Sequence, residues 1–200
     1  MPRLNFWFEF ASTYSYPAAM RIEALAGTKG VAIRWRPFLL GPLFAAQGWR
    51  DSPFNIYPVK GRYMWRDLER ICEALELPLK RPDPFPQSSL LAARVALALP
   101  ERLAAPFARA VYAAEFGQGR SISDRAFIGG LIAKLGEDER ETLARAESPD
   151  NKAALKAACD EAATLGVPGA PAAVTEDGEV FWGNDRLEQA VEWAKKGSRQ

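Results

Sequence analysis

The sequence of 200 residues predicts an α/β fold whose sheet is interrupted by an inserted all-α domain. Three observations support this prediction. A strand, a helix and a second strand fit the first 40 residues, and helical periodicity runs through the middle of the chain. Strand character returns only near the end, around an Asp-Gly step. The chain is long enough to bury a sizeable core.

The opening segment predicts a parallel βαβ unit. The first strand is expected over residues 4–10, where aromatic side chains point to both faces, as in a strand covered on two sides. A helix follows over 17–25 and ends at the turn residues 27–30. The second strand begins at residue 31 and stops near Pro37. So short a crossover predicts parallel strands with a right-handed connection.

The next segment, residues 41–58, is rich in proline and glycine and predicts a loop that leaves the sheet. Helical spacing of apolar residues then predicts five or six helices. We expect Ser121 and Ser123 to be candidates for the N-cap of the fourth. The expected ranges are 59–75, 89–99, 103–116, 124–135, 138–146 and 151–165.

The last segment predicts a hairpin and a closing helix. Two short apolar runs, 172–174 and 179–182, flank Asp177 and Gly178, which is a strong hairpin signal. A helix is expected over 187–195. The order βαβ, helical block, ββα is that of a thioredoxin fold with an inserted helical domain. We expect residues 1–58 and 160–200 to form the thioredoxin-like domain and 59–159 the insertion.

The overall charge is nearly balanced, with 26 basic and 25 acidic residues. Bulk electrostatics therefore predict neither nucleic acid nor an anionic membrane as a partner, and favour a small molecule. No apolar stretch approaches the length of a membrane span, and no signal-peptide pattern is recognisable at the start. We expect a cytoplasmic protein.

The chain contains no histidine, which excludes Ser-His and Cys-His nucleophilic pairs, the usual zinc motifs and an imidazole base. Its two cysteines, Cys72 and Cys159, lie far apart in helical patterns, so we interpret them as small core residues. No metal site is expected. An enzyme with this composition must take its reactive group from a cofactor.

The turn after the first strand is the most informative motif. Ser12 lies where a helix begins, and free N–H groups and the helix dipole favour an anion there. Thioredoxin-like oxidoreductases carry a cysteine pair at this corner, whose leading thiol has a lowered pKa. A serine cannot exchange disulfides, but its hydroxyl can donate to the thiolate of a bound cofactor, which indicates glutathione. The alternative is that Ser12 or Thr13 only caps the helix.

A second motif, Gly169-Ala170-Pro171, lies just before the hairpin. We predict a cis bond before Pro171, which would turn the Ala170 backbone outward for an extended cysteinyl peptide. In a thioredoxin-like fold this segment faces the first helix start, so Ala170 and Ser12 are expected to approach each other. An ordinary trans-proline turn is the alternative.

A third motif stands where the last helix begins. Asn184 and Asp185 are suited to cap that helix and to balance its dipole. Asp185 is also suited to bind the α-ammonium of a γ-glutamyl group, with the local backbone N–H groups binding the carboxylate beside it, and the two roles are compatible.

These motifs together carry a family resemblance. Five segments, FEFASTYSY (8–16), PVKGRYMWRD (58–67), PFPQSS (84–89), GAP (169–171) and FWGNDRL (181–187), resemble 2-hydroxychromene-2-carboxylate isomerases. These are glutathione-dependent members of the DsbA-like group, close to kappa-class glutathione transferases. The resemblance spans nearly the whole chain in the right order.

The resemblance implies a glutathione site. The Ser12 hydroxyl would face the glutathione sulfur and is the implied catalytic group, while the backbone of Ala170 would pair with the cysteinyl unit. Asp51 and Asn55 are rivals for one contact, and Lys60 is either a partner of a carboxylate or a solvated lysine. Thr13 departs from the proline that the family often has. The implied cofactor-binding residues are Ser12, Thr13, Tyr14, Asn55, Lys60, Ala170, Pro171, Asn184 and Asp185.

The implied reaction is reversible addition of the glutathione thiolate to an unsaturated aromatic substrate, with rotation and elimination. Two alternatives stay open, a kappa-like transferase or peroxidase and a non-catalytic thioredoxin-like binding module. The oligomeric state, a homodimer included, stays open too. The candidates for an aromatic substrate wall, each of which is also suited to core packing, are Trp7, Tyr14, Phe38, Phe54, Tyr57, Tyr63 and Trp65.

Overall fold

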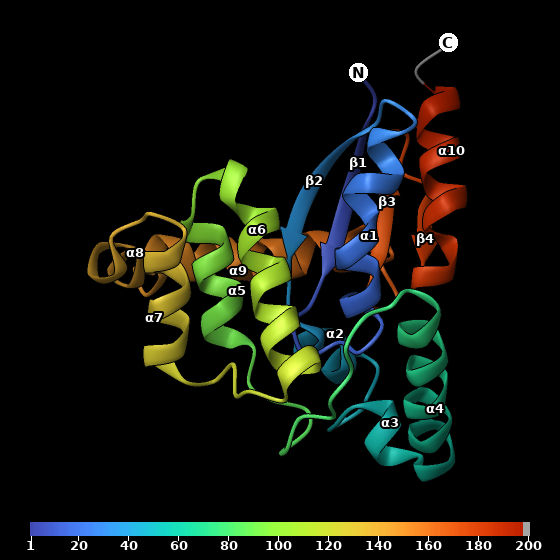
Figure 1. Ribbon diagram of the computed structural model, residues 1–200. Helices are drawn as coiled ribbons and strands as arrows, with labels where there is room; N and C mark the ends of the chain where they lie inside the picture. The colour runs from blue at the N-terminus through green and yellow to red at the C-terminus, as the bar shows by residue number, and fades with distance from the viewer. Residues whose placement is uncertain (198–200) are drawn as a thin grey trace.

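The sheet has four strands and is mixed. In the computed structural model, which describes residues 1–197, the strand order is β2-β1-β3-β4 (Figure 1). The β1 and β2 strands are parallel, with Phe6 opposite Trp35, and β3 is antiparallel to both β1 and β4. The strands are β1 (Arg3–Phe8), β2 (Ala32–Pro37), β3 (Ala172–Thr175) and β4 (Val180–Trp182).

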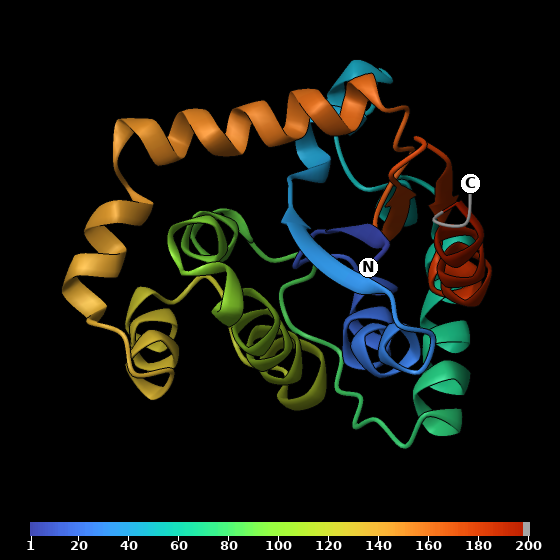
Figure 2. The same ribbon diagram turned by 90° about the horizontal axis from the view of Figure 1, so that it is seen from above.

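Helices cover both faces of this sheet and extend beyond one edge. Figure 2 shows α9 along one face, with α1 and α10 on the other, while α5 to α8 gather beside β2. A π-helical turn, Ala113–Gly117, continues α6, and a 3-10 turn, Asn184–Arg186, precedes α10. The helices are α1 (Ser15–Gly27), α2 (Leu40–Ala46), α3 (Pro53–Ile56), α4 (Pro58–Ala74), α5 (Leu90–Ala98), α6 (Glu101–Tyr112), α7 (Arg125–Lys134), α8 (Glu139–Ala146), α9 (Pro149–Thr164) and α10 (Leu187–Gly197).

Two cores follow from the alternation of side chains along β1. Successive side chains of a strand point to opposite faces. Phe6 and Phe8 therefore enter the larger core beneath α1 and α6, and Trp7 enters a smaller core beneath α9. All three rings are almost fully buried. Each such side chain contributes about 1.5–3 kcal/mol of burial energy, so β1 ties the two layers of helices together.

The predicted thioredoxin fold with inserted helices is confirmed, as are the parallel βαβ unit and the hairpin. The expected loop over 41–58 is wrong, because α2 begins at Leu40 and runs into it and α3 lies within it. Pro53 occupies the first turn of α3, where its missing N–H costs nothing, and the Ser52 hydroxyl accepts from the Phe54 N–H at 3.3 Å. Proline and serine, which are common in loops, can therefore also mark the start of a helix.

The predicted caps at Ser121 and Ser123 are also wrong. Asp124 is the N-cap of α7, and its carboxylate accepts from the N–H groups of Ala126 and Phe127 at 2.8 and 3.3 Å. A carboxylate at this position satisfies two free N–H groups and also answers the helix dipole. The helix therefore begins one residue later than the serines imply.

The predicted boundary between residues 159 and 160 lies inside α9. The division into 1–58 with 160–200 and 59–159 stays a prediction, and its last three residues lie outside the described part. Cys72 and Cys159 are both free thiols. Among residues 1–197, every helix is too short or too polar to cross a bilayer.

Candidate functional site

The topology brings two distant segments to one end of the sheet. The Ser12 turn follows the carboxyl end of β1 and leads directly into α1. Because β3 runs antiparallel to β1, the segment that precedes β3 lies at that same end. Figure 1 shows α3 and α4 beyond this end. Carboxyl ends of parallel strands are where open α/β sheets commonly bind ligands.

The Ser12 turn and the segment before β3 are in direct contact. The Ser12 hydroxyl donates to the Ala170 carbonyl at 2.9 Å, although 158 positions separate the two residues. The bond between Ala170 and Pro171 is cis. The predicted approach and the predicted isomer are both confirmed. Ala170 itself is half-buried.

Neither Ser12 nor Thr13 is the N-cap of α1. The residue before the helix is Tyr14, whose side chain makes no capping bond. The Ser12 oxygen accepts from the Ser15 N–H at 3.3 Å, which is a long bond. Thr13 is buried and donates to the Met64 sulfur at 3.1 Å, which fastens the turn to α4.

Two backbone N–H groups before α1 differ from their neighbours in hydrogen bonding. The N–H groups of Ser12, Ser15 and Tyr16 donate to backbone carbonyls within the turn. Within residues 1–197, Thr13 and Tyr14 donate no such bond. Two N–H groups beside the positive end of a helix dipole favour an anion. Thr13 itself is only 2% exposed, and the anion site stays a prediction.

Tyr14 connects the turn to α4 and α3. Its phenol donates to Asp67 Oδ2 at 3.0 Å, and its ring lies 6.3 Å from that of Phe54. Burial, followed by the neighbouring Asp67 carboxylate, raises the pKa of the phenol above its usual value. Tyr14 is therefore a neutral side chain over the physiological range.

Asn55 and Lys60 lie at the exposed corner between α3 and α4. The Asn55 amide donates to both carboxylate oxygens of Asp51, each at 3.2 Å. The two rival candidates for one glutathione contact are thus partners of each other. The Lys60 ammonium lies 4.6 Å from the centre of the Tyr57 ring. Both Asn55 and Lys60 are solvent-exposed.

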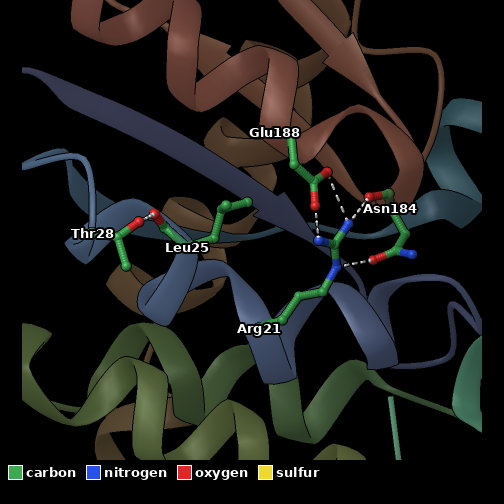
Figure 3. A network of polar contacts seen from close by, with 5 residues as sticks. All are labelled: Arg21, Leu25, Thr28, Asn184 and Glu188. Atoms are coloured by element: carbon green, nitrogen blue, oxygen red, sulfur yellow. Dashed lines mark hydrogen bonds and ion pairs between the residues drawn. The ribbon is translucent and has the colours of Figure 1, made fainter. Parts of the chain in front are cut away.

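Sequence reasoning missed Arg21, which organises the start of α10 (Figure 3). Its Nε donates to Asn184 Oδ1 at 2.9 Å, and its terminal nitrogens reach the Asn184 carbonyl and the Glu188 carboxylate. Asn184 is buried and does not cap α10. More than 160 positions separate Arg21 from these partners, and no local pattern could have predicted the contact.

Asp185 has a different environment. Its side chain is 73% exposed, and its nearest basic group is Arg186 at 3.8 Å. A Cβ on Gly183, which has φ +119°, would meet the Asp185 carboxylate at 2.4 Å. Glycine therefore permits this carboxylate to fold over the backbone. Asn184 and Asp185, which were predicted to act together, therefore differ in exposure: the amide is buried and the carboxylate is exposed.

We expect Arg21→Met to lower the free energy of unfolding by about 2 kcal/mol, because it removes bonds from a charged donor to two partners and leaves Asn184 oxygens unsatisfied. Chemical denaturation measures the loss. Arg186→Met is the matched control, since that side chain is 56% exposed and its ion pair is long; it should change stability by less than about 0.5 kcal/mol. Equal effects of the two substitutions would contradict a structural role for the Arg21 network.

Several expected substrate-wall aromatics do not lie at the site. Trp7 and Phe38 pack edge to face at 5.9 Å in the core beneath α9. Trp65 borders a separate open hollow of about 390 Å³, together with Cys72 and Leu77. Aromatic side chains near the Ser12 turn and the α3–α4 corner are Tyr14, Phe54, Tyr57 and Tyr63.

Comparisons with known proteins identify the family of this chain. The model of the DSBA-like thioredoxin domain matches residues 3–193. The chain belongs to the DSBA-like thioredoxin family. It is 31% identical over 186 residues to a 2-hydroxychromene-2-carboxylate isomerase of Sphingobium xenophagum, which covers 92% of this chain and 94% of that protein. A solved 2-hydroxychromene-2-carboxylate isomerase superposes with a TM-score of 0.87 at 26% identity, over 99% of this chain and 97% of that one.

A further relative extends the comparison. Glutathione S-transferase kappa 1 of Caenorhabditis elegans is 35% identical over 86 residues, which cover 42% of this chain and 37% of that protein. The resemblance to the isomerases and to kappa-class transferases is confirmed. The prediction of an isomerase-like enzyme is confirmed at the level of the family.

Proposed function

We propose that this DSBA-like protein is a glutathione-dependent isomerase of aromatic substrates of the 2-hydroxychromene-2-carboxylate type, with Ser12 as the group that stabilises the thiolate. The contact between Ser12 and Ala170 carries the proposal, because it brings a hydroxyl, the start of a helix and the half-buried Ala170 backbone together in one place. The relationship to isomerases of that name supports the substrate class.

The residues present fit glutathione. The N–H groups of Thr13 and Tyr14 favour an anion, and the half-buried backbone of Ala170 next to Pro171 suits an extended cysteinyl unit. Asn55 and Lys60 supply polar groups for one carboxylate end of the tripeptide. Asp185 supplies an exposed carboxylate for the ammonium of the γ-glutamyl end, and Asn184 the neighbouring backbone.

An exchange of hydrogen bonds gives Ser12 its role. Its hydroxyl donates to the Ala170 carbonyl, the same acceptor that an extended peptide backbone would use. A peptide N–H that pairs with Ala170 would compete for this carbonyl and release the hydroxyl. The freed O–H is then available to donate to a sulfur anion beside the helix start, which lowers the thiol pKa.

Bound glutathione would supply a thiolate that adds to an unsaturated substrate carbon and leaves again, so no net oxidation or reduction takes place. The chain itself contributes a hydroxyl, helix N–H groups and an aromatic surface. Tyr14 stays neutral and offers its ring with that of Phe54. A reducing cytoplasm is the compartment that keeps glutathione as the thiol.

Calorimetric titration with glutathione, followed by measurement of the bound thiol pKa, tests the proposal. We expect binding and a thiol pKa well below its free value, and conversion of a chromene carboxylate to its isomer. The matched probe is S-methylglutathione, which should bind without supporting turnover. Glutathione that binds with its thiol protonated at neutral pH would favour a passive binding module and remove the catalytic proposal.

The kappa-class match favours a second candidate, a transferase that uses the same thiol site with a different acceptor. Mass analysis of the products separates the two functions. An isomer keeps the mass of the substrate, whereas a transferase or peroxidase leaves a glutathione conjugate or oxidised glutathione. Product of unchanged mass supports the isomerase, and a conjugate supports the transferase.

A further inference from the structure

A buried acid stands directly behind the Ser12 turn. Glu9 is only 4% exposed, and its backbone carbonyl accepts from the Ser12 N–H at 3.0 Å and from the Tyr112 phenol at 2.8 Å. Its side-chain carboxylate accepts from the Ser89 hydroxyl. The residue that begins the Ser12 turn is therefore also a titratable group held in the core.

A second buried acid lies on the π-helical turn that follows α6. Glu115 is fully buried, and neither of its side-chain oxygens has a hydrogen-bond partner among the described residues. An ionised carboxylate in such a place is very costly unless it is paired. π-Helical turns inside helices often occur at functional sites. Glu115 therefore needs either a proton or a ligand.

The surroundings of the two acids favour the proton. Burial raises the pKa of Glu9 to about 7, although hydrogen bonds from the Ser89 hydroxyl and the Ala11 N–H act to lower it. Burial, and then the charge of Glu9, raise the pKa of Glu115 well above its usual value. The other groups that face them are Tyr112 on α6, the Ser15 hydroxyl beside it, and the Cys159 thiol on α9, and none of these is a cation.

We propose that Glu9 and Glu115 form a neutral, proton-holding acid pair behind the Ser12 turn, and that Glu9 is a positioning residue that limits the thiolate site at alkaline pH. The catalytic half of this inference rests on the proposed function. A thiolate near Ser12 is most stable when no other anion lies close to it. Loss of the Glu9 proton adds a buried anion at the base of the same turn.

The sign of the pH dependence follows from the raised pKa. An acid with a higher pKa in the folded protein than in the unfolded chain stabilises the fold fully below the unfolded value. That contribution declines as pH rises from 4.5, the ordinary value, to about 7, the folded value of Glu9. We therefore expect stability and thiolate formation to share an alkaline limit near neutrality.

Infrared difference spectroscopy of the ligand-free protein tests the acid pair without glutathione. We expect carbonyl bands of protonated carboxylic acids at about pH 6, where exposed carboxyls are ionised. Glu9→Gln should remove the band that disappears near neutrality, and Glu115→Gln should remove the more persistent one. Glu101→Gln, an exposed control, should change neither. The absence of both bands at about pH 6 would overturn the proposal.

The catalytic half is tested by the pH profile of the bound thiol and of turnover. Glutamine mimics the neutral acid, so Glu9→Gln should match the wild type at about pH 6 and exceed it several-fold at about pH 8. A purely structural role would lower both rates together. Should Glu9→Gln fail to fold, the wild-type infrared titration and Glu115→Gln still decide the question.

The acid pair and the proposed function can be contradicted independently of each other. Protonated acids in a protein that does not bind glutathione would contradict the proposed function and leave the acid-pair proposal standing. Glutathione binding by a protein in which both acids are ionised at about pH 6 would contradict the acid-pair proposal and leave the proposed function standing.

Discussion

Ser12→Ala should lower turnover about 100-fold, because one positioned donor to a developing or resting anion typically contributes that much. Glutathione affinity should change by less than about threefold, since the backbone of Ala170 and the helix N–H groups remain. The variant also removes the hydroxyl that contacts Ala170 in the free protein. Its chief effect should be a bound thiol pKa closer to the free value.

The measurements are the isomerisation rate, the glutathione dissociation constant and the pKa of the bound thiol in the same variant. Ser123→Ala is the control, because that exposed hydroxyl donates only to the Ser88 carbonyl at 3.3 Å. It should leave all three quantities unchanged. A Ser12→Ala protein with an unchanged rate would remove Ser12 from the mechanism, whatever its effect on stability.

Gly61→Ala should lower the free energy of unfolding by about 2 kcal/mol, as overpacking of a fixed contact does. A Cβ at this position of α4 would lie 2.3 Å from the Phe54 carbonyl oxygen, a backbone atom of α3. The two helices must therefore separate. Because Phe54 also meets Tyr14, and Asn55 follows it, glutathione affinity should fall with stability.

Gly130→Ala is the matched control, since it is the same change in the interior of α7. No atom lies within 4 Å of its added Cβ. It should raise stability by about 0.5–1 kcal/mol through better helix propensity and a less flexible unfolded chain. Thermal and denaturant unfolding compare the pair. The two substitutions should change the free energy of unfolding in opposite directions. If both are stabilising, α3 does not pack against Gly61.

Local signals predicted the elements that local physics controls. The hairpin around Gly178, the parallel unit and the helix ranges follow from turn chemistry and periodicity, so they were placed within a few residues. The errors arose where one residue type serves two purposes. Pro53 and Ser52 begin a helix in a segment that their presence marked as a loop.

The Ser12 turn was predictable because its residues are contiguous. Its contact with Ala170 was predictable because the order of the elements fixes which strand ends meet. Arg21 was not predictable, because its bonds to Asn184 and Glu188 join residues whose separation carries no pattern. Trp7 and Phe38 were candidates for a ligand wall until the position of α9 placed them in a core.

The sequence alone determined the order of the strands and helices, the serine in the turn before the first helix, and the absence of an imidazole, because each depends on residue identity or on near neighbours. Only the tertiary structure decided which polar side chains are buried. Burial depends on what packs against a residue from distant parts of the chain. No pattern in the sequence indicated that the Glu9 and Glu115 side chains are both buried, and only the fold shows it.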